Sequence, residues 1–352
     1  MIKLILSILL RIFRNIIFHH RRNNNILVIN NGKIGDLICS TPFYRSLKNS
    51  GNDFNITLMA GKDMAHVLRD NPDIDQIITK DSIIDLTRHF DICFVLSPST
   101  NALHLANKLL PRKVFSICPN YGKSSIRASK LSSDHYIEYR HDKTVLETYL
   151  ELLTLIGINS GSTQKHFHQT PCSYPQPASR ISFSISISTG NNLKEWDAKQ
   201  IRDLLLIISQ TIETPTFYLL GSSEDIIKGE EISTELPNTY NLCGKYSLSE
   251  TAHIIGNSSL FMGFDSALTY IADSINTPII YISGPTDFIE QRPMGLNVRI
   301  IYNPDLPCRP CSFVYKTNRK CTNAIDKECL KSLDYQLIAE ECKSLVSLNL
   351  KQ

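Results

Sequence analysis

Short runs of β-branched and apolar residues alternate with helical stretches from Ile26 to near the end of the chain, and this pattern limits the fold most strongly. Runs of this kind occur at Ile26–Ile29, Asn55–Met59, Asp91–Leu96 and Pro278–Ile282. The alternation is typical of βαβ units that build parallel sheets. The chain has 352 residues, 42% of them hydrophobic and 20% charged, which is enough for two α/β domains with a core each.

The alternation is interrupted once, between Gly157 and Arg180, where Ser, Thr, Gln and Pro dominate. We therefore predict a linker over residues 159–180, between one Rossmann-like domain at 26–158 and another at 181–352. The fold class is α/β, with two doubly wound sheets. In such sheets ligands bind at the carboxyl ends of the strands, so residues that directly follow a strand are the candidates for a site.

The first 25 residues form a separate basic segment, because no acidic residue precedes Asp36. We predict an amphipathic helix whose polar stripe carries Lys3, Ser7, Arg11 and Arg14. Its uncharged run is too short to cross a bilayer, and basic residues follow it in place of a cleavage site. We expect residues 1–22 to lie in an anionic membrane surface with the basic side chains facing the headgroups. Packing on the protein or a partner, or an uncleaved signal or single anchor, are the alternatives.

The net charge of +3 is too small to indicate a nucleic-acid partner. Most of the ten cysteines are scattered, several within apolar runs, which indicates a reducing compartment and a cytoplasmic location. Four are concentrated between residues 308 and 329, namely Cys308, Cys311, Cys321 and Cys329. They could hold a structural zinc ion, pair under oxidation, or pack as free thiols.

The first candidate site follows the strand Ile26–Ile29. Asn30–Pro42 contains two glycines, which allow close approach of the backbone to a ligand, and Asp36 near the start of a helix. A carboxylate there can accept a proton from a hydroxyl group, or it can simply cap the helix.

Two further candidates follow strands of the second domain. In Ser188–Trp196, Thr189, Gly190 and nearby backbone N–H groups could bind a diphosphate, with Lys194 adding positive charge. The alternative for Lys194 is a solvated surface lysine. In Leu219–Asp225 an acidic residue, for which we choose Glu224 over Asp225, could hold a nucleotide ribose or serve only as a helix-start charge.

Several of these segments resemble glycosyltransferase family 9, the lipopolysaccharide heptosyltransferases. The stretch around Asp36 resembles the opening motif of the family: a basic residue, Ile-Gly-Asp, Thr-Pro and a helix. Asn71–Ile77 resembles its Asn-Pro-x-Ile-Asp-x-Ile segment, and Ser188–Trp196 its small-residue turn with Lys-x-Trp. Gly263–Ala272 resembles Asp-Ser/Thr-Gly-x-x-His-x-Ala, and Gly284–Thr286 the Gly-x-Thr loop. The resemblance covers nearly everything after the N-terminal helix.

The resemblance implies a GT-B fold, in which two Rossmann-like domains face a cleft, and a metal-independent transfer of a sugar with inversion. It makes Asp36 the catalytic base and places Lys33 and Gly35 on the acceptor side, with no cofactor required for catalysis. The residues that it implies for donor binding are Thr189, Gly190, Lys194, Glu224, Asp265, Ser266, Ala267, Tyr270 and Thr286.

The implied partners are a nucleotide-sugar, ADP-heptose or a relative of it, and a lipid-linked saccharide such as a lipopolysaccharide core. The implied location is the cytoplasmic face of the inner membrane of a Gram-negative bacterium. Two alternatives keep the fold and change the function. One is a nucleotide-sugar epimerase or hydrolase, and the other is a non-catalytic glycan-binding member of the family.

Two positions depart from the family motif. Ala267 stands where the family has glycine, and Tyr270 where it has histidine. Alanine still offers its backbone N–H if the local φ is negative, whereas tyrosine donates a hydrogen bond but carries no positive charge near neutral pH. Either the donor differs from ADP-heptose, or the contact is made in another way, or activity is reduced.

Overall fold

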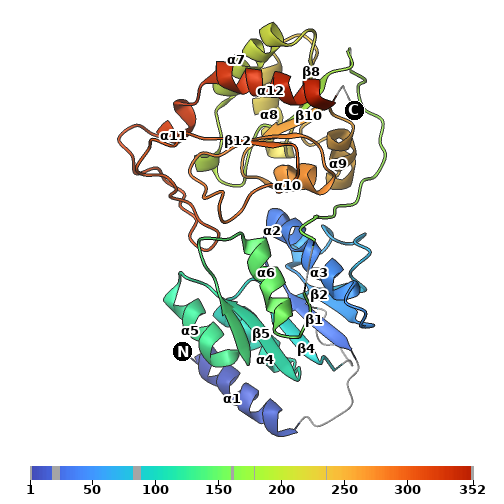
Figure 1. Ribbon diagram of the computed structural model, residues 1–352, viewed down its shortest axis with the longest axis vertical. Coiled ribbons are helices and arrows are strands. Elements are labelled where there is room, and N and C mark those ends of the chain that lie inside the picture. The colour runs from blue at the N-terminus through green and yellow to red at the C-terminus, as the bar shows by residue number, and fades with distance from the viewer. Residues whose placement is uncertain are drawn as a thin grey trace. The chain divides into compact units, whose positions relative to one another are not determined.

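The computed structural model describes residues 2–17, 24–81, 89–159, 162–177, 179–234 and 236–349 (Figure 1). The chain divides into two compact units, Met1–Thr163 and Gln164–Gln352. The break lies inside the segment 159–180. After the break the chain contacts the second unit, since Thr170 N donates to Ser249 O (3.0 Å) and Tyr218 Oη donates to Pro175 O (2.8 Å).

The first unit contains a parallel sheet with the strand order β3-β2-β1-β4-β5-β6 among its described residues. The strands are β1 (Asn25–Ile29), β2 (Asn55–Met59), β3 (Gln76–Ile78), β4 (Ile92–Val95), β5 (Lys113–Cys118) and β6 (His135–Glu138). The helices are α1 (Ile2–Ile17), α2 (Ile34–Cys39), α3 (Thr41–Lys48), the 3-10 turn η1 (Lys62–Met64), α4 (Thr100–Lys108), α5 (Lys123–Ser132) and α6 (Val145–Thr154).

The second unit repeats this connectivity, with the strand order β12-β11-β10-β7-β8-β9 and all pairs parallel. The strands are β7 (Ser182–Ser186), β8 (Thr216–Leu220), β9 (Thr239–Asn241), β10 (Leu260–Gly263), β11 (Ile279–Ile282) and β12 (Val298–Ile301). The helical elements are η3 (Asn192–Lys194), α7 (Ala198–Thr211), η4 (Ser223–Asp225), α8 (Ile226–Ser233), α9 (Leu248–Gly256), α10 (Ala267–Ser274), α11 (Glu328–Lys331) and α12 (Tyr335–Asn349). Two Rossmann-like sheets of this order confirm the predicted α/β fold class.

The central strands form where the sequence is continuously apolar or small, because helices cover both faces of a parallel sheet. All five residues of β7 and all five of β8 are buried. By contrast β6, β9 and β12 were not predicted. All three lie at a sheet edge and are short, with residues that are mostly half-exposed or exposed, so they lack the apolar run by which a strand is predicted.

Each sheet has one place where the order of winding reverses, between β1 and β4 in the first unit and between β7 and β10 in the second. Helices on opposite faces of the sheet diverge at such a switch point and leave room for a ligand beyond the strand ends. The candidate residues Asp36, Lys194 and Asp265 all follow strands that border a switch point.

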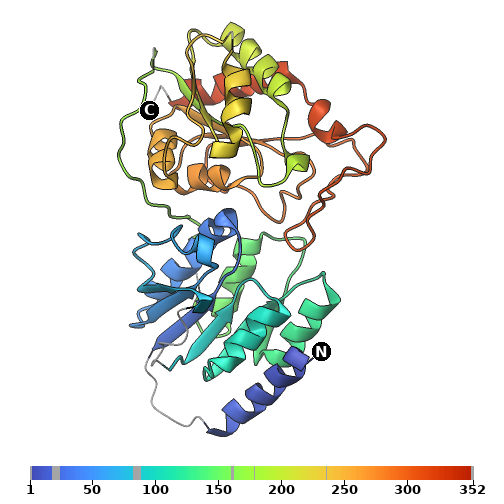
Figure 2. The same ribbon diagram turned by 180° about the vertical axis from the view of Figure 1, so that it is seen from behind.

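The N-terminal segment forms a helix, α1, as predicted, and α1 packs on α4 and α5 (Figures 1 and 2). Its polar stripe faces the protein. Lys3 Nζ donates to Asn101 Oδ1 (2.9 Å), Arg11 Nε to Asp134 Oδ1 (3.3 Å), and Ser7 is buried. Lys3 and Arg11 therefore have hydrogen-bond partners on the protein, from α4 and from Asp134 directly after α5. Their expected contact with lipid headgroups stays a prediction.

Residues 18–23 lie outside the described part of the chain, as does the side chain of Arg14. Among the helices that are described, none is long and apolar enough to cross a bilayer.

Candidate active site

In the first unit the turn after β1 holds Asp36 in a defined position. Asp36 lies in the first turn of α2, and its Oδ2 accepts a hydrogen bond from the backbone N–H of Lys33 (2.9 Å). A Cβ atom on Gly32 would lie 2.5 Å from the Cβ of Asp36, so only glycine fits there. Asp36 therefore does cap helix α2, which was the alternative to a role in catalysis. The side chain of Lys33 is exposed, and Gly35 is half-exposed beside it.

Asn30, which sequence reasoning did not single out, fixes the shape of this turn. It is fully buried, its Oδ1 accepts from Gly32 N (3.0 Å), and its Nδ2 donates to Ser40 Oγ (3.2 Å). Across the switch point, Asn31 N donates to Ser97 Oγ beyond the end of β4 (2.7 Å). The sequence signal that could have identified Asn30 was its position as a polar residue directly after a buried strand. The turn is thus held from both sides of the switch point.

In the second unit three predicted donor-binding residues converge on the carboxylate of a fourth, Asp265. Lys194 Nζ lies 2.5 Å from Asp265 Oδ2, and both side chains are mostly buried. Tyr270 Oη donates to Asp265 Oδ1 (2.6 Å), and Thr286 Oγ1 donates to Oδ2 (3.1 Å). These residues follow β7, β10 and β11, so the switch point brings them together.

The surroundings of Asp265 favour the ionised form of its carboxyl group. Burial by itself would raise the pKa of its carboxyl group, but the charge of Lys194 and the hydrogen bonds from Lys194, Tyr270 and Thr286 hold the pKa below its usual value. The cluster therefore pairs a carboxylate with an ammonium group close to the start of α10.

Ser266 and Ala267 form the start of α10. The hydroxyl groups of Ser186 and Ser266 share a hydrogen bond (3.2 Å). Ala267 is the first helical residue and is absent from the described residues with positive φ. The glycine of the family motif is therefore not needed for the backbone conformation at this position, and the N–H groups at the helix start are retained.

The turn after β7 is closed by its own side chains. Thr189 Oγ1 donates to Asn191 O (2.7 Å), so the hydroxyl group that we assigned to the donor holds the turn around Gly190. Thr189 N donates to Glu195 Oε2 (2.5 Å), and Lys228 Nζ donates to Glu195 Oε1 (3.2 Å). Glu195 was missed by sequence reasoning, although it lies next to Lys194 in the motif.

Trp196 anchors this loop in the core of the second unit. Its Nε1 donates to Leu330 O (3.0 Å), and its ring packs edge-on against Phe264 at 5.4 Å between centroids. Phe264 immediately precedes Asp265. The packing of this aromatic side chain therefore links the Lys194 loop to the Asp265 loop.

Glu224 and Asp225 have different environments. Asp225 Oδ2 accepts from Ser222 N (2.7 Å), and a Cβ on Gly221 would lie 2.7 Å from that oxygen. This repeats the geometry of Gly32 and Asp36 in the first unit, so Asp225 serves the turn. Glu224 is exposed at the carboxyl end of β8. The assignment of Glu224 to the donor stays a prediction.

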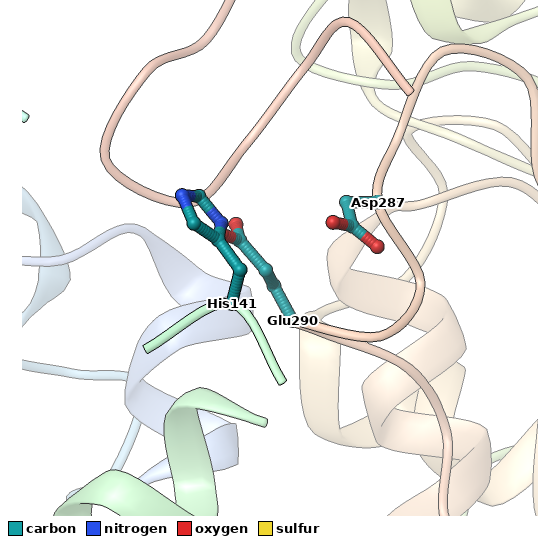
Figure 3. A group of neighbouring side chains, drawn as sticks. All are labelled: His141, Asp287 and Glu290. Carbon is teal, nitrogen blue, oxygen red and sulfur yellow. The ribbon is translucent and has the colours of Figure 1, made fainter. Parts of the chain in front are cut away.

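Arg309, also missed from the sequence, connects the loop that carries Thr286 to the cysteine-rich segment. Its Nε donates to Gly284 O (2.5 Å) and its Nη2 to Ser283 Oγ (2.8 Å), while the guanidinium lies 4.7 Å from the Tyr302 ring centre. Figure 3 shows Asp287 and Glu290 on the chain that continues from this loop; Glu290 accepts from Val314 N (2.7 Å). The segment after β11 is thus held by polar contacts along its length.

The four clustered cysteines line one small cavity of about 20 Å³, and none forms a disulfide. Burial raises the pKa of the Cys329 thiol to about 11 and also raises that of Cys311. Among the described residues, no three of these sulfur atoms lie within 4.8 Å of one another. The structure therefore gathers the thiols but does not bring them to the spacing of a metal-bound set.

Residues 131–322 match the family model "Glycosyltransferase family 9 (heptosyltransferase)". The matched residues make up more than half of the chain. The chain belongs to glycosyltransferase family 9. It is therefore a glycosyltransferase, as predicted. The alternatives of an epimerase or hydrolase and of a non-catalytic binding protein are not favoured. Lys194, Asp265, Tyr270 and Thr286 all lie within the matched residues, whereas Asp36 precedes them.

Two curated relatives of this glycosyltransferase are similar along most of their length. Lipopolysaccharide heptosyltransferase 3 of Escherichia coli K12 is 23% identical over 88% of this chain and 97% of its own. Lipooligosaccharide heptosyltransferase 2 of Haemophilus influenzae is 26% identical over 74% of this chain and 83% of its own. Among solved structures, the E. coli ADP-heptose lps heptosyltransferase II superposes with a TM-score of 0.70 at 19% identity, covering 92% of this chain and 99% of its own. The fold of this glycosyltransferase is thus of the GT-B type.

Proposed function

We propose that this glycosyltransferase transfers a heptose from ADP-heptose to a sugar of a lipopolysaccharide core, with inversion at the anomeric carbon. The observation that carries the proposal is the convergence of Lys194, Tyr270 and Thr286 on Asp265 at the switch point of the second unit. The names of the relatives, which are lipopolysaccharide heptosyltransferases, support the choice of sugar and acceptor.

The donor diphosphate binds near Lys194 and the start of α10 in this proposal. Lys194 supplies positive charge, and the first N–H groups of α10 are directed toward an anion placed there. Thr189 and Gly190 shape the turn beside it, Ser266 and Thr286 supply hydroxyl groups, and Glu224 accepts from the ribose. Leaving-group charge is then neutralised by the protein, and catalysis requires no metal or other cofactor.

Asp36 is the proposed general base. The acceptor hydroxyl oxygen attacks the anomeric carbon, the bond from that carbon to the diphosphate oxygen breaks, and the electron pair leaves with ADP. The hydroxyl proton passes to the Asp36 carboxylate. The hydrogen bond from Lys33 N is compatible with this role, because a carboxylate has about four lone-pair sites. Lys33 and Gly35 form the acceptor side of the turn.

Tyr270 is the proposed determinant of donor choice. A histidine could become cationic near the donor phosphates, whereas Tyr270 offers one neutral O–H that is already directed at Asp265. Tyr270 orients Asp265, and Ala267 keeps the backbone conformation that the family motif has at the start of α10. If the donor is not ADP-heptose, these are the residues that select another nucleotide-sugar.

The cysteine cluster remains a proposed structural zinc site. Four thiols lining one cavity are a suitable ligand set for zinc, but the sulfur atoms must move closer together to share an ion. Such an ion would hold the segment 308–329, and through Arg309 the loop of Thr286. No step of catalysis depends on it.

The proposed place of work is the cytoplasmic face of the inner membrane of a Gram-negative bacterium, where a lipid-linked core saccharide would be available. The relatives are bacterial enzymes named for lipopolysaccharide or lipooligosaccharide. None of the ten cysteines, all of which lie in the described part of the chain, forms a disulfide, which suits a reducing compartment. No nucleic-acid partner is proposed.

A donor-binding screen tests this proposal. Purified protein is heated with ADP-heptose and with ADP-, GDP- and UDP-hexoses, and the midpoint of unfolding is recorded. We expect ADP-heptose to stabilise the protein most and Lys194→Ala to remove the effect. Stabilisation only by donors that carry no heptose would contradict the heptose assignment. The different choice of donor would then be attributed to Tyr270.

A further inference from the structure

The outward face of α1 is apolar along its described length. Its exposed large residues are Ile2, Ile5, Leu6, Leu9, Ile12 and Phe13, each with between 44% and 73% of its surface accessible. They recur at three- and four-residue spacing, so they form one continuous stripe on the helix. A water-soluble surface rarely carries such a stripe without a partner.

The opposite face of α1 is held to the first unit by specific polar contacts. Asn107 Nδ2 donates to Ser7 Oγ (3.1 Å) and also to Ser132 O (2.9 Å), so one buried amide joins α1, α4 and α5. Arg11 Nη1 donates to Leu131 O (3.1 Å). The apolar stripe is therefore outward because the polar stripe is fixed inward.

The chain around α1 is basic. No acidic residue occurs before Asp36 or between Asp91 and Asp134, and the second interval contains α4 and α5. Lys108, Lys123 and Arg127 on these two helices are exposed. An apolar stripe on a helix whose neighbouring helices carry exposed positive charge is complementary to the surface of an anionic bilayer.

The dimensions of α1 also favour a bilayer over a second copy of the chain. Sixteen residues make a helix about 24 Å long and about 10 Å wide. Its outer stripe would bury only a few hundred Å² per copy, less than the roughly 800 Å² per partner of a stable dimer. The same helix lies readily in the headgroup region, and it is too short to cross the roughly 30 Å hydrocarbon core.

We infer that α1 attaches this protein to the surface of an anionic phospholipid bilayer by inserting its apolar stripe, with Lys3, Ser7 and Arg11 fixed to the protein. Insertion orients the first unit, which carries Asp36, toward lipid-linked molecules. The inference deepens the proposed function and rests on it for its biological purpose. The attachment itself can be measured without donor or acceptor, so that either claim can fail alone.

The test uses the full chain and vesicles of phosphatidylethanolamine with phosphatidylglycerol. The variant Ile5→Gln/Leu9→Gln/Ile12→Gln changes exposed positions of α1 and should keep the unfolding temperature of the wild type. We expect wild-type protein to float with these vesicles and the variant to bind at least about tenfold more weakly. The matched control Ile227→Gln/Leu296→Gln/Leu337→Gln changes exposed apolar residues of the second unit and should bind like the wild type.

Three measurements complete the design. A Leu9→Trp variant should show a blue-shifted emission on vesicles, since Trp196 is buried and contributes a constant signal. Part of the binding should persist at high salt. Light scattering should show the same oligomeric state for the wild type and the α1 variant, since α1 is not expected to form a dimer interface.

The inference is overturned if wild-type protein does not bind vesicles, or if the α1 variant binds equally well. It is also overturned if binding disappears completely in salt, which would mean that basic residues alone are responsible. Transfer to a water-soluble acceptor fragment should be unchanged in the α1 variant, and its absence in all variants would count against the proposed function alone.

Discussion

Lys194 Nζ lies 2.5 Å from Asp265 Oδ2 across the switch point of the second sheet, with both side chains mostly buried. The two residues are 71 positions apart in sequence and meet because β7 and β10 are neighbours. An ammonium group in this position can pair with the carboxylate or with a phosphate, so donor binding and the stability of the unit are coupled.

Lys194→Met should impair donor binding and stability together. It removes the positive charge and leaves Asp265 buried without its cation, a loss of about 3–5 kcal/mol. The KM for the donor should rise at least about tenfold. The double variant Lys194→Met/Asp265→Asn should recover much of the stability but not the KM. Urea unfolding and steady-state kinetics measure the two effects, with exposed Lys199→Met as the control. A KM unchanged in Lys194→Met would exclude contact with the donor.

Acid should weaken the second unit through Asp265. The pKa of this carboxyl group is depressed in the folded protein, so the unfolded chain binds a proton first as the pH falls. The stabilisation is complete above the ordinary value of 3.8 and is lost as the pH falls toward the lower folded value. The free energy of unfolding should therefore decrease more steeply at acid pH in the wild type than in Lys194→Met/Asp265→Asn. Parallel curves for the two proteins would show that Asp265 is not held as an anion.

Asp36 and Asp225 provide a matched pair, because each closes the same kind of turn after a strand. An asparagine can still accept the backbone hydrogen bond, so both Asp36→Asn and Asp225→Asn should cost only about 1 kcal/mol of stability. With saturating donor, Asp36→Asn should lower kcat by about 10²–10⁴-fold, since it removes the proton acceptor. Asp225→Asn should leave kcat within a few-fold of wild type. Equal effects on kcat would reduce Asp36 to a capping residue.

Tyr270 should control donor selection more than folding. Tyr270→Phe removes one hydrogen bond to Asp265 and should cost about 1–2 kcal/mol of stability. Tyr270→His restores the family residue and should raise kcat/KM for ADP-heptose relative to Tyr270→Phe. The ratio of kcat/KM for ADP-heptose and for an ADP-hexose checks this. An identical ratio in the wild type, Tyr270→Phe and Tyr270→His would show that Tyr270 does not take part in donor recognition.

The cysteine cluster predicts a metal content that can be measured directly. Protein purified without chelator should contain about one zinc ion per chain by elemental analysis, held by four thiolates. Cys308→Ser/Cys311→Ser should lose the ion, while the buried and distant Cys243→Ser should keep it. Removing zinc should lower the unfolding temperature, because the ion binds the folded chain more tightly than the unfolded chain. Metal-free protein with an unchanged unfolding temperature would leave the thiols as packing residues.

The parts that sequence reasoning predicted well are those where one physical pattern dominates. Central strands such as β1 and β8 are continuous apolar runs, and the turns that follow them contain glycines that their close contacts require. The convergence of Lys194, Tyr270 and Thr286 on Asp265 could be expected because all follow neighbouring strands. The hydrogen bonds that the carboxylate accepts depend on tertiary packing and were not predictable.

The parts that sequence reasoning missed depend on partners far away in the chain. The short strand β6 forms only because β5 offers an edge to pair with. The orientation of α1 follows from Asn107 and Asp134 on neighbouring elements, and a helical pattern alone does not show which stripe faces inward. Asn30, Glu195 and Arg309 support the site through backbone contacts, for which their residue types are not specific.

Acceptor-dependent heptosyl transfer is the measurement that tests the central claim most directly. Wild-type protein is incubated with ADP-heptose and a core saccharide lacking the terminal heptose, and ADP and the saccharide mass are followed together. The account predicts one heptose added per ADP released, an inverted anomeric centre, and almost no ADP release without acceptor. Release of ADP or free heptose without acceptor, or transfer by Asp36→Asn at the wild-type rate, would contradict it.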